Sequence, residues 1–138
     1  MSDADLRRDL VTANRVAHHE GLFEAFGHIS ARVPGSQDWF YIARRMSPAL
    51  VTADDLLCMD VRGNVVEGSG RPNMEFWIHA SIYAARPDVG VVVHAHPPYC
   101  VALANAGQTV RALYEGSFTG GTSYFGLTAS GFLFPVLT

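Results

Sequence analysis

The sequence contains no lysine: its ten basic residues are all arginine and lie scattered along the 138 residues. With 13 acidic residues the net charge is −3, so no basic field is available to attract nucleic acid or an anionic membrane surface. Charged residues make up only 17% of the chain, against about 25% in an average soluble domain. Apolar residues make up 49%, which excludes intrinsic disorder.

Cysteine is also scarce. Cys58 and Cys100 are too few for a disulfide scaffold, and we expect both to be buried as small hydrophobic residues in a reducing compartment. The charged N-terminal segment lacks the apolar core of a signal peptide. No window reaches the roughly 18 uninterrupted apolar residues that a membrane helix needs. The sequence therefore predicts a cytoplasmic globular protein with one domain and no membrane or nucleic-acid partner.

Charge almost disappears from the last third of the chain. Residues 89–138 contain only Arg111 and Glu115 as charged residues, and residues 117–138 contain none while remaining rich in Phe, Leu and Tyr. An exposed apolar surface of this kind marks an interface or an aggregation risk. Two explanations stay open: this part is buried in an oligomer, or the chain stops before the elements that would cover it.

Hydrophobic periodicity and turn residues predict short strands mixed with helices. We expect a first helix that Ser2 caps and Gly21 ends, and a second helix that Asn73 caps. Together these hairpins and helices predict an α+β or layered α/β/α domain. The expected strands span residues 28–33, 39–42, 57–61, 65–67 and 89–96, the second and third helices span 74–86 and 99–105, and more strand follows residue 107.

The strongest chemical signal is His94-Ala95-His96 at the end of an apolar run. Alternate residues of a strand point to the same face, so the two imidazoles can chelate one divalent ion. Pro97 and Pro98 follow directly and would end the strand there, at a sheet edge that a ligand can reach. Two histidines satisfied by ordinary hydrogen bonds are an equally good interpretation of this motif.

Glu75 and His79 form a second group, because residues four apart share a face of a helix. Glu75 beside a metal would be a proton shuttle; the competing interpretation is a glutamate that only complements the helix dipole. We expect His79 to be packed and hydrogen-bonded. His28 and Ser30 would point to one face of the first strand.

A loop arginine pair is the last candidate. Arg44 and Arg45 could bind a carboxylate or phosphate through paired N–H donors, although an adjacent pair of this kind is more often solvated.

Several motifs in order resemble the class II aldolase/adducin family. They are GHISAR at 27–32, RPNME at 71–75, IH at 78–79, RPDV at 86–89 and VHAHP at 93–97. The resemblance runs over about residues 6–121. It implies a three-layer α/β/α fold with a central, mainly antiparallel sheet, assembled as a homotetramer with metal sites near the interfaces.

The resemblance also implies roles for individual residues. His94 and His96 match two of three histidines that hold the catalytic cation, Zn²⁺ or another divalent ion such as Mn²⁺. Glu75 matches the acid/base residue, and Tyr114 is similar to a tyrosine that acts as proton donor in a neighbouring subunit's site. His28, Ser30, Arg44, Arg45 and Asn73 are the expected substrate-binding residues.

Three departures from the family pattern shape the expected function. No histidine follows His96, so the chain is expected to lack its C-terminal part, or else His28, Glu75 or water supplies the third ligand. Asn73-Met74 stands where sugar-phosphate aldolases carry two serines, and His28 stands where they carry asparagine. Two arginines suit a carboxylated substrate better than a phosphate. These features favour the decarboxylase-like branch.

We therefore expect a metal-dependent carbon–carbon lyase that acts on a small hydroxy or oxo acid or a sugar-derived substrate. It would work by retro-aldol cleavage or decarboxylation through a metal-stabilised enolate. The alternative is a non-catalytic, adducin-like interaction domain or a metal-free remnant.

Overall fold

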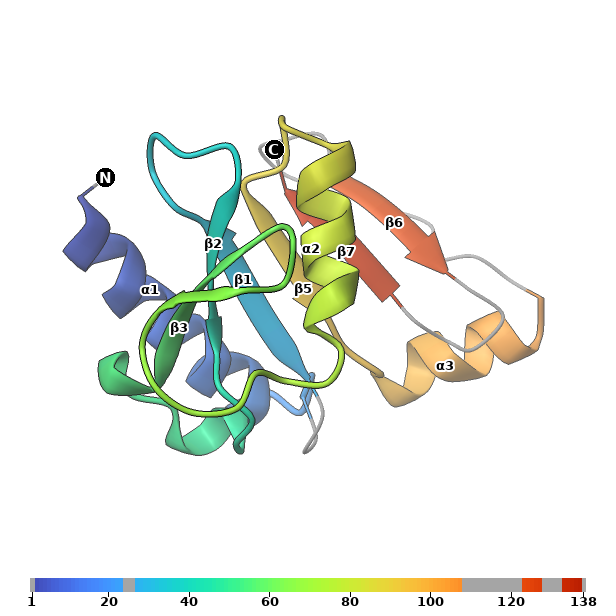
Figure 1. Ribbon diagram of the computed structural model, residues 1–138. Coiled ribbons are helices and arrows are strands. Elements are labelled where there is room, and N and C mark those ends of the chain that lie inside the picture. The colour runs from blue at the N-terminus through green and yellow to red at the C-terminus, as the bar shows by residue number, and fades with distance from the viewer. Residues whose placement is uncertain (1, 24–26, 108–122, 128–132, 138) are drawn as a thin grey trace.

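The computed structural model describes residues 2–23, 27–107, 123–127 and 133–137. Its centre is a seven-stranded sheet with the strand order β4-β3-β2-β1-β5-β7-β6. Every pair of neighbouring strands is antiparallel. Helices lie on both faces of this sheet (Figure 1). The layered α/β/α fold with a central antiparallel sheet is therefore confirmed.

Helices and strands follow one another along the chain in the order that the sequence predicts. The strands are β1 (His28–Arg32), β2 (Trp39–Ala43), β3 (Leu56–Asp60), β4 (Val65–Glu67), β5 (Val91–His94), β6 (Ser123–Leu127) and β7 (Leu133–Leu137). The helices are α1 (Asp3–His19), α2 (Phe76–Ala85) and α3 (Pro98–Asn105), with two 3-10 turns, η1 (Pro48–Leu50) and η2 (Ala53–Asp55).

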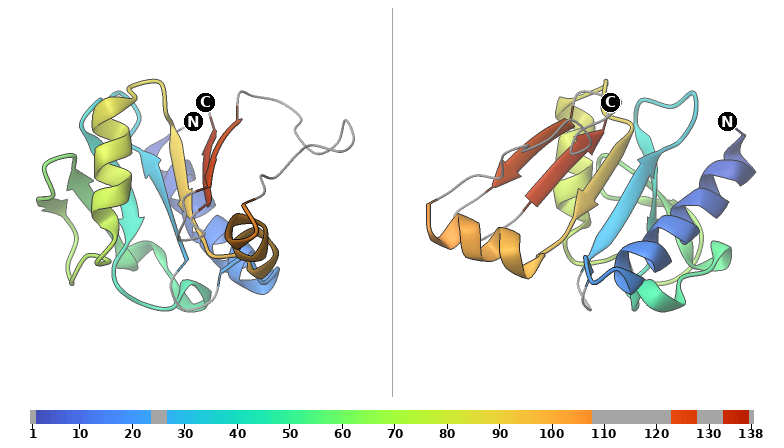
Figure 2. Two further views of the ribbon diagram at one scale, coloured as in Figure 1. Left: turned by 90° about the vertical axis from the view of Figure 1, so that its right-hand side faces the viewer. Right: turned by 180° about the vertical axis from the view of Figure 1, so that it is seen from behind.

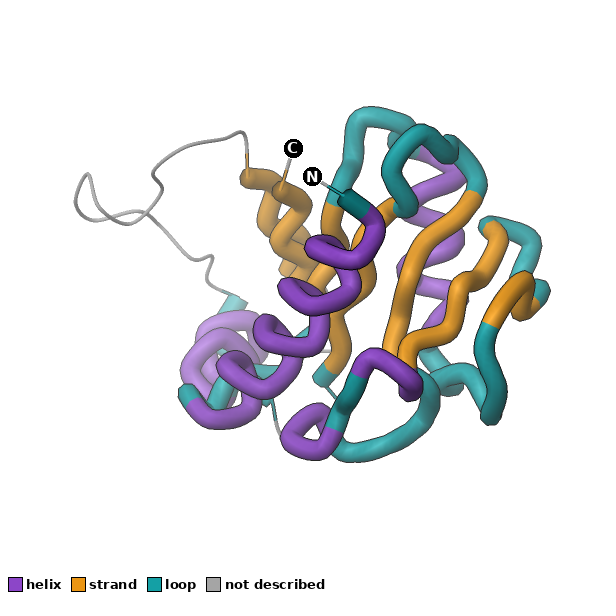
Figure 3. Tube along the Cα trace, turned by 90° about the vertical axis from the view of Figure 1, so that its left-hand side faces the viewer, coloured by secondary structure: helices purple, strands orange, loops and turns teal. Residues whose placement is uncertain are grey.

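Helix α1 covers one face of the sheet. It begins with a capping box, in which Ser2 and Asp5 each bind the other's backbone N–H. Leu6 and Leu10 are buried against side chains of β1, β2 and β3, including Ile29 and Ala31. Figure 3 shows α1 lying across the strands, with η1 and η2 beside it. The predicted N-cap of this helix is confirmed.

Helix α2 covers the face of the sheet opposite α1, and α3 lies on the same side of the sheet as α1 (Figure 2, left). Ala80 and Tyr83 of α2 are buried against Phe40, Ile42 and Val92 of the strands. Because side chains alternate along a strand, residues 29 and 31 face α1 while His28 and Ser30 face α2. The two-residue period of β1 therefore sends both polar side chains under α2.

Two elements, β5 and α2, differ from the sequence prediction by more than one residue at a boundary. The strand expected over residues 89–96 is shorter, since β5 ends at His94 and Pro98 already begins α3. Prolines have no N–H to give to a strand ladder, so pairing stops before them. The helix expected from Met74 begins at Phe76, because the Asn73 side chain accepts the Glu75 N–H and holds a turn there.

Of the two cysteines, Cys58 is buried, as expected, whereas Cys100 is only half-buried. In the described part of the chain, no helix is both long enough and apolar enough to cross a membrane. The strand expected after residue 107 is present as β6 and β7.

Candidate metal and acid/base site

Two histidines meet across neighbouring strands. His28 of β1 and His94 of β5 are directly opposite each other in the antiparallel ladder. Their rings stack with centroids 4.8 Å apart and planes 16° from parallel. The His28 side chain is 3% exposed and the His94 side chain is fully buried. The ladder register therefore creates a buried pair of imidazoles on the α2 face of the sheet.

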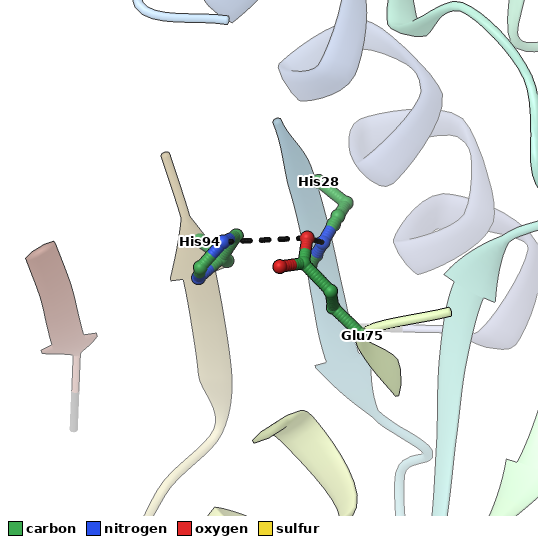
Figure 4. A group of neighbouring side chains, drawn as sticks. All are labelled: His28, Glu75 and His94. Atoms are coloured by element: carbon green, nitrogen blue, oxygen red, sulfur yellow. Dashed lines mark hydrogen bonds and ion pairs between the residues drawn. The ribbon is translucent and has the colours of Figure 1, made fainter. Parts of the chain in front are cut away.

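Glu75 reaches this pair from the turn before α2. The Asn73 side chain accepts the Glu75 N–H at 3.0 Å, and this turn makes Glu75 the N-cap of the helix. Its carboxylate Oε2 lies 3.3 Å from His28 Nε2 and 3.5 Å from His94 Nε2. Figure 4 shows the carboxylate directed between the two rings. With its side chain 35% exposed, Glu75 is the solvent-facing member of the group.

The three side chains have the geometry of a small metal site. One ligand atom from each of His28, Glu75 and His94 lies within 4.8 Å of the other two. A tetrahedral cation with bonds of about 2.0–2.1 Å separates its ligands by about 3.3–3.5 Å. The two contacts of Glu75 Oε2 already have this length. Two imidazole nitrogens and one carboxylate oxygen are a donor set that Zn²⁺ and similar divalent ions accept.

His96 lies beside this group and not within it. Its ring meets the His94 ring edge-on, with centroids 4.8 Å apart. The predicted closeness of the His94 and His96 rings is thus present, although His96 follows the end of β5. The three-residue donor group contains His28 and Glu75 in place of His96. A role for His96 as metal ligand stays a prediction.

Behind His28, a buried chain of hydrogen bonds runs under α2. His28 Nδ1 lies 2.6 Å from His79 Nε2, and His79 Nδ1 lies 2.6 Å from Ser30 Oγ. Ser30 Oγ in turn lies 2.8 Å from the Tyr83 hydroxyl. Ser30, His79 and Tyr83 are buried almost completely. The expectation of a packed, hydrogen-bonded His79 is confirmed.

Burial disfavours the protonated form of these imidazoles. It lowers the pKa of His94 to about 4, and the neighbouring His28 acts in the same direction. Burial also lowers the pKa of His28, although Glu75 opposes that shift. The pKa of His79 falls well below its usual value because the ring is buried and lies near two other histidines. Neutral imidazole is the form that binds a metal.

Comparison with known proteins identifies the family of the chain. Residues 8–128 match the family described as "Class II Aldolase and Adducin N-terminal domain". The chain belongs to this family. A "3,4-dihydroxyphthalate decarboxylase" of Arthrobacter keyseri is 32% identical, in a match that covers 82% of this chain and 49% of that protein.

Solved structures of class II aldolases share the fold. The "L-fuculose 1-phosphate aldolase from Glaciozyma antarctica PI12" is 29% identical with a TM-score of 0.71, over 78% of this chain and 46% of that one. The l-fuculose-1-phosphate aldolase of Thermus thermophilus is 28% identical with a TM-score of 0.66, over 83% and 58%. The chain thus spans about half the length of its class II aldolase relatives.

Three other residues expected from the class II aldolase resemblance, Arg44, Arg45 and Ser30, make hydrogen bonds within the protein. Arg44 Nε donates to Asp55 at 2.7 Å, and the Arg45 N–H donates to the Arg71 carbonyl. Ser30 makes its hydrogen bonds inside the buried chain. Tyr114 lies outside the described residues. Substrate contacts of Arg44, Arg45, Ser30 and Asn73 stay predictions.

One member of the site was not expected from the sequence. The Tyr83 hydroxyl is the last member of the buried chain of hydrogen bonds. The Arg32 guanidinium lies over the Tyr83 ring, 4.7 Å from the ring centroid. The sequence shows only that Tyr83 follows His79 by four residues and therefore shares its helix face, which does not identify a partner for its hydroxyl.

Proposed function

We propose that this chain is the metal-binding part of a divalent-metal-dependent carbon–carbon lyase of the class II aldolase family. One observation carries the proposal: the Glu75 carboxylate lies 3.3 and 3.5 Å from ring nitrogens of two buried histidines. A carboxylate at this distance can share a cation with both rings and still exchange protons. Cleavage by retro-aldol reaction or by decarboxylation is compatible with this arrangement.

His28, His94 and Glu75 would hold the cation, with His96 beside His94 as a further candidate. A bound divalent cation acts as a Lewis acid toward negative charge that develops on substrate oxygens. The two histidines are buried, so they keep water away from the inner side of the site. Zn²⁺ and Mn²⁺ are the ions that we propose to test.

Glu75 would transfer the proton. Both of its contacts with histidine use Oε2, and its side chain is the exposed one of the three. Oε1 is therefore the oxygen that we assign to proton exchange with a substrate. In decarboxylation the bond to the carboxyl carbon breaks, its electron pair stays on the substrate carbon, CO₂ leaves, and a proton that Glu75 has taken from solvent ends on that carbon. In retro-aldol cleavage, Glu75 would first accept the proton of the substrate hydroxyl. The carbon–carbon bond would then break to give a carbonyl and an enolate, and the same proton would end on the enolate carbon.

The substrate that we propose is a small carboxylated hydroxy acid. The loop of Arg44 and Arg45 is bound to the segment before Glu75, through the Arg44–Pro72 bridge and the bond to the Arg71 carbonyl. Guanidinium groups bind carboxylates through paired N–H donors. The 32% identical relative is named for a dicarboxylic substrate, which favours decarboxylation. Proton donation by Tyr114, a homotetramer and a cytoplasmic location remain part of the proposal.

The test is turnover by the full chain loaded with Zn²⁺ or Mn²⁺. One arm measures CO₂ release from 3,4-dihydroxyphthalate, and the other measures aldehyde release from L-fuculose 1-phosphate. We expect metal-dependent CO₂ release that His94→Ala abolishes and that His18→Ala, at an exposed position, retains. Aldehyde release alone would identify an aldolase. A chain that binds no cation and cleaves neither compound would contradict the proposal and favour an adducin-like interaction domain.

A further inference from the structure

The buried chain behind His28 has a direction that the donor groups determine. Glu75, as a carboxylate, can only accept, so the His28 Nε2 that faces it carries the hydrogen. The Nδ1 of a neutral His28 then accepts, and His79 Nε2 donates to it. His79 Nδ1 accepts from Ser30, and Ser30 accepts from Tyr83. In the metal-free protein, each donor of this chain of hydrogen bonds therefore points its hydrogen toward the Glu75 end.

A cation at His28 requires the opposite direction. A metal takes the lone pair of the ring nitrogen, so His28 Nε2 can no longer carry a hydrogen. Neutral His28 would then donate from Nδ1 to His79, His79 from Nδ1 to Ser30, and Ser30 to the Tyr83 hydroxyl. Each ring keeps one hydrogen in both states. The hydrogen that leaves Nε2 of each ring exchanges with solvent and one returns to Nδ1, so the hydrogen-bond chain holds the same number of protons in both states.

We propose that His79, held by Ser30 and Tyr83, is a positioning residue that accommodates both tautomers of His28, because its Nε2 can donate to His28 Nδ1 or accept from it. It lets His28 present a hydrogen to Glu75 when no cation is bound and a lone pair when one is. The geometry that carries this proposal is the unbroken run of contacts at 2.8, 2.6 and 2.6 Å from Tyr83 to His28. The part of the proposal that concerns cation-bound His28 rests on the proposed function, and the part that concerns the metal-free protein does not.

The test reads tautomers directly, by two-bond ¹H–¹⁵N correlation spectra of the histidine rings in the full chain. Metal-free protein should show His28 and His79 each with the hydrogen on Nε2. One equivalent of Zn²⁺ should move both hydrogens to Nδ1. His28 with its hydrogen on Nδ1 in the metal-free protein would overturn the proposal.

Two variants separate positioning from mere packing. Ser30→Ala removes the partner of His79 Nδ1. Glu75 should still keep the hydrogen of metal-free His28 on Nε2, and Zn²⁺ affinity should fall by about 10–100-fold because His79 loses the acceptor that it needs in the cation-bound state. Tyr83→Phe keeps the ring that packs 5.0 Å from Phe40 and removes only the hydroxyl. It should leave the metal-free tautomers unchanged and weaken Zn²⁺ binding by about 10-fold, since the reversed chain loses its final acceptor.

Ser81→Ala, on an exposed position of the same helix, is the matched control and should change neither readout. If Ser30→Ala and Tyr83→Phe both leave the Zn²⁺ affinity unchanged, the hydrogen-bond chain is structural only and the proposal is wrong. If the wild type binds no Zn²⁺, the proposed function fails. The proposed reversal then fails with it, and the metal-free spectra still decide whether the hydrogen bonds point toward Glu75 in the metal-free protein.

Discussion

His28 and His94 are cross-strand partners whose rings stack at 4.8 Å, although 66 positions separate them in the numbering of the chain. The antiparallel register of β1 and β5 alone brings them together. Shifting that register by one residue would turn one of the two side chains to the α1 face. The candidate site therefore depends on the sheet as much as on the residues that line it.

The first prediction concerns Glu75. Glu75→Gln keeps the size of the side chain but removes its ability to exchange a proton. We expect kcat for the lyase reaction to fall by about 10²–10⁴-fold, the usual contribution of a general acid or base. Steady-state kinetics with the metal-loaded chain measures the change.

Glu20→Gln is the control for charge, because Glu20 is exposed at the end of α1, on the face of the sheet opposite α2. It should retain wild-type kcat. A Glu75→Gln variant with unchanged kcat would show that another group moves the proton.

The second prediction concerns Arg32, whose guanidinium fastens β1 to the end of α2. Its N–H groups donate to the backbone carbonyls of Tyr83, Arg86 and Val89, at 3.0, 2.9 and 2.9 Å, and to that of Gln37. A lysine cannot span these acceptors with one ammonium group. Arg32→Lys should lower the free energy of unfolding by about 1–3 kcal/mol.

Urea denaturation of Arg32→Lys and of the exposed-site variant Arg62→Lys makes the comparison. The Arg62 variant should differ from wild type by less than about 0.5 kcal/mol. Equal unfolding free energies for the two variants would mean that the Arg32 hydrogen bonds contribute no net stability.

The third prediction is a pH dependence of stability. The pKa of His94 is about 4 in the folded chain, and burial also lowers the pKa of His28 and His79. Between about pH 6.5 and pH 4 the unfolded chain binds a proton on His94 and the folded chain does not, and the lowered pKa values of His28 and His79 act in the same direction. The free energy of unfolding should therefore fall on acidification, by up to about 1.4 kcal/mol per pH unit for His94.

Denaturation curves of the metal-free chain at pH 7 and pH 5 check this dependence. His94→Gln should flatten it, and His18→Gln, at an exposed position, should leave it unchanged. Lowered carboxyl pKa values, such as that of Asp55, affect stability only below about pH 4 and do not disturb the window. A stability that stays constant from pH 7 to pH 5 would show that the histidines can be protonated within the fold.

Much of the fold could be predicted because its signals are local. Ser2 with Asp5 in the first turn, the glycine in the β3–β4 turn and the proline after α2 each mark an element boundary through its own backbone chemistry. The start of α2 was misplaced because Asn73 can accept the N–H of a helix or of a preceding turn. Only the folded chain decides between these two uses of the same side chain.

Residue spacing predicted the site only where its members are close in sequence, and His28 entered only as one alternative for the third ligand, from the family resemblance. Strand alternation brings His94 near His96, and helix spacing places Glu75 and His79 on one face. The contact of His28 with His94 needs the strand order, which no local pattern contains. Tyr83 was missed because a buried tyrosine on an apolar stripe gives no sign that its hydroxyl has a polar partner.

The most direct test of the central claim is the metal content of the purified full chain after dialysis against Zn²⁺ and removal of free ion. Elemental analysis should find about one Zn²⁺ per chain in the wild type and in the exposed-site variant His19→Ala. His94→Ala should contain almost none, because it removes one of the two buried rings. A wild type without bound cation, or a His94→Ala variant that keeps it, would contradict the account.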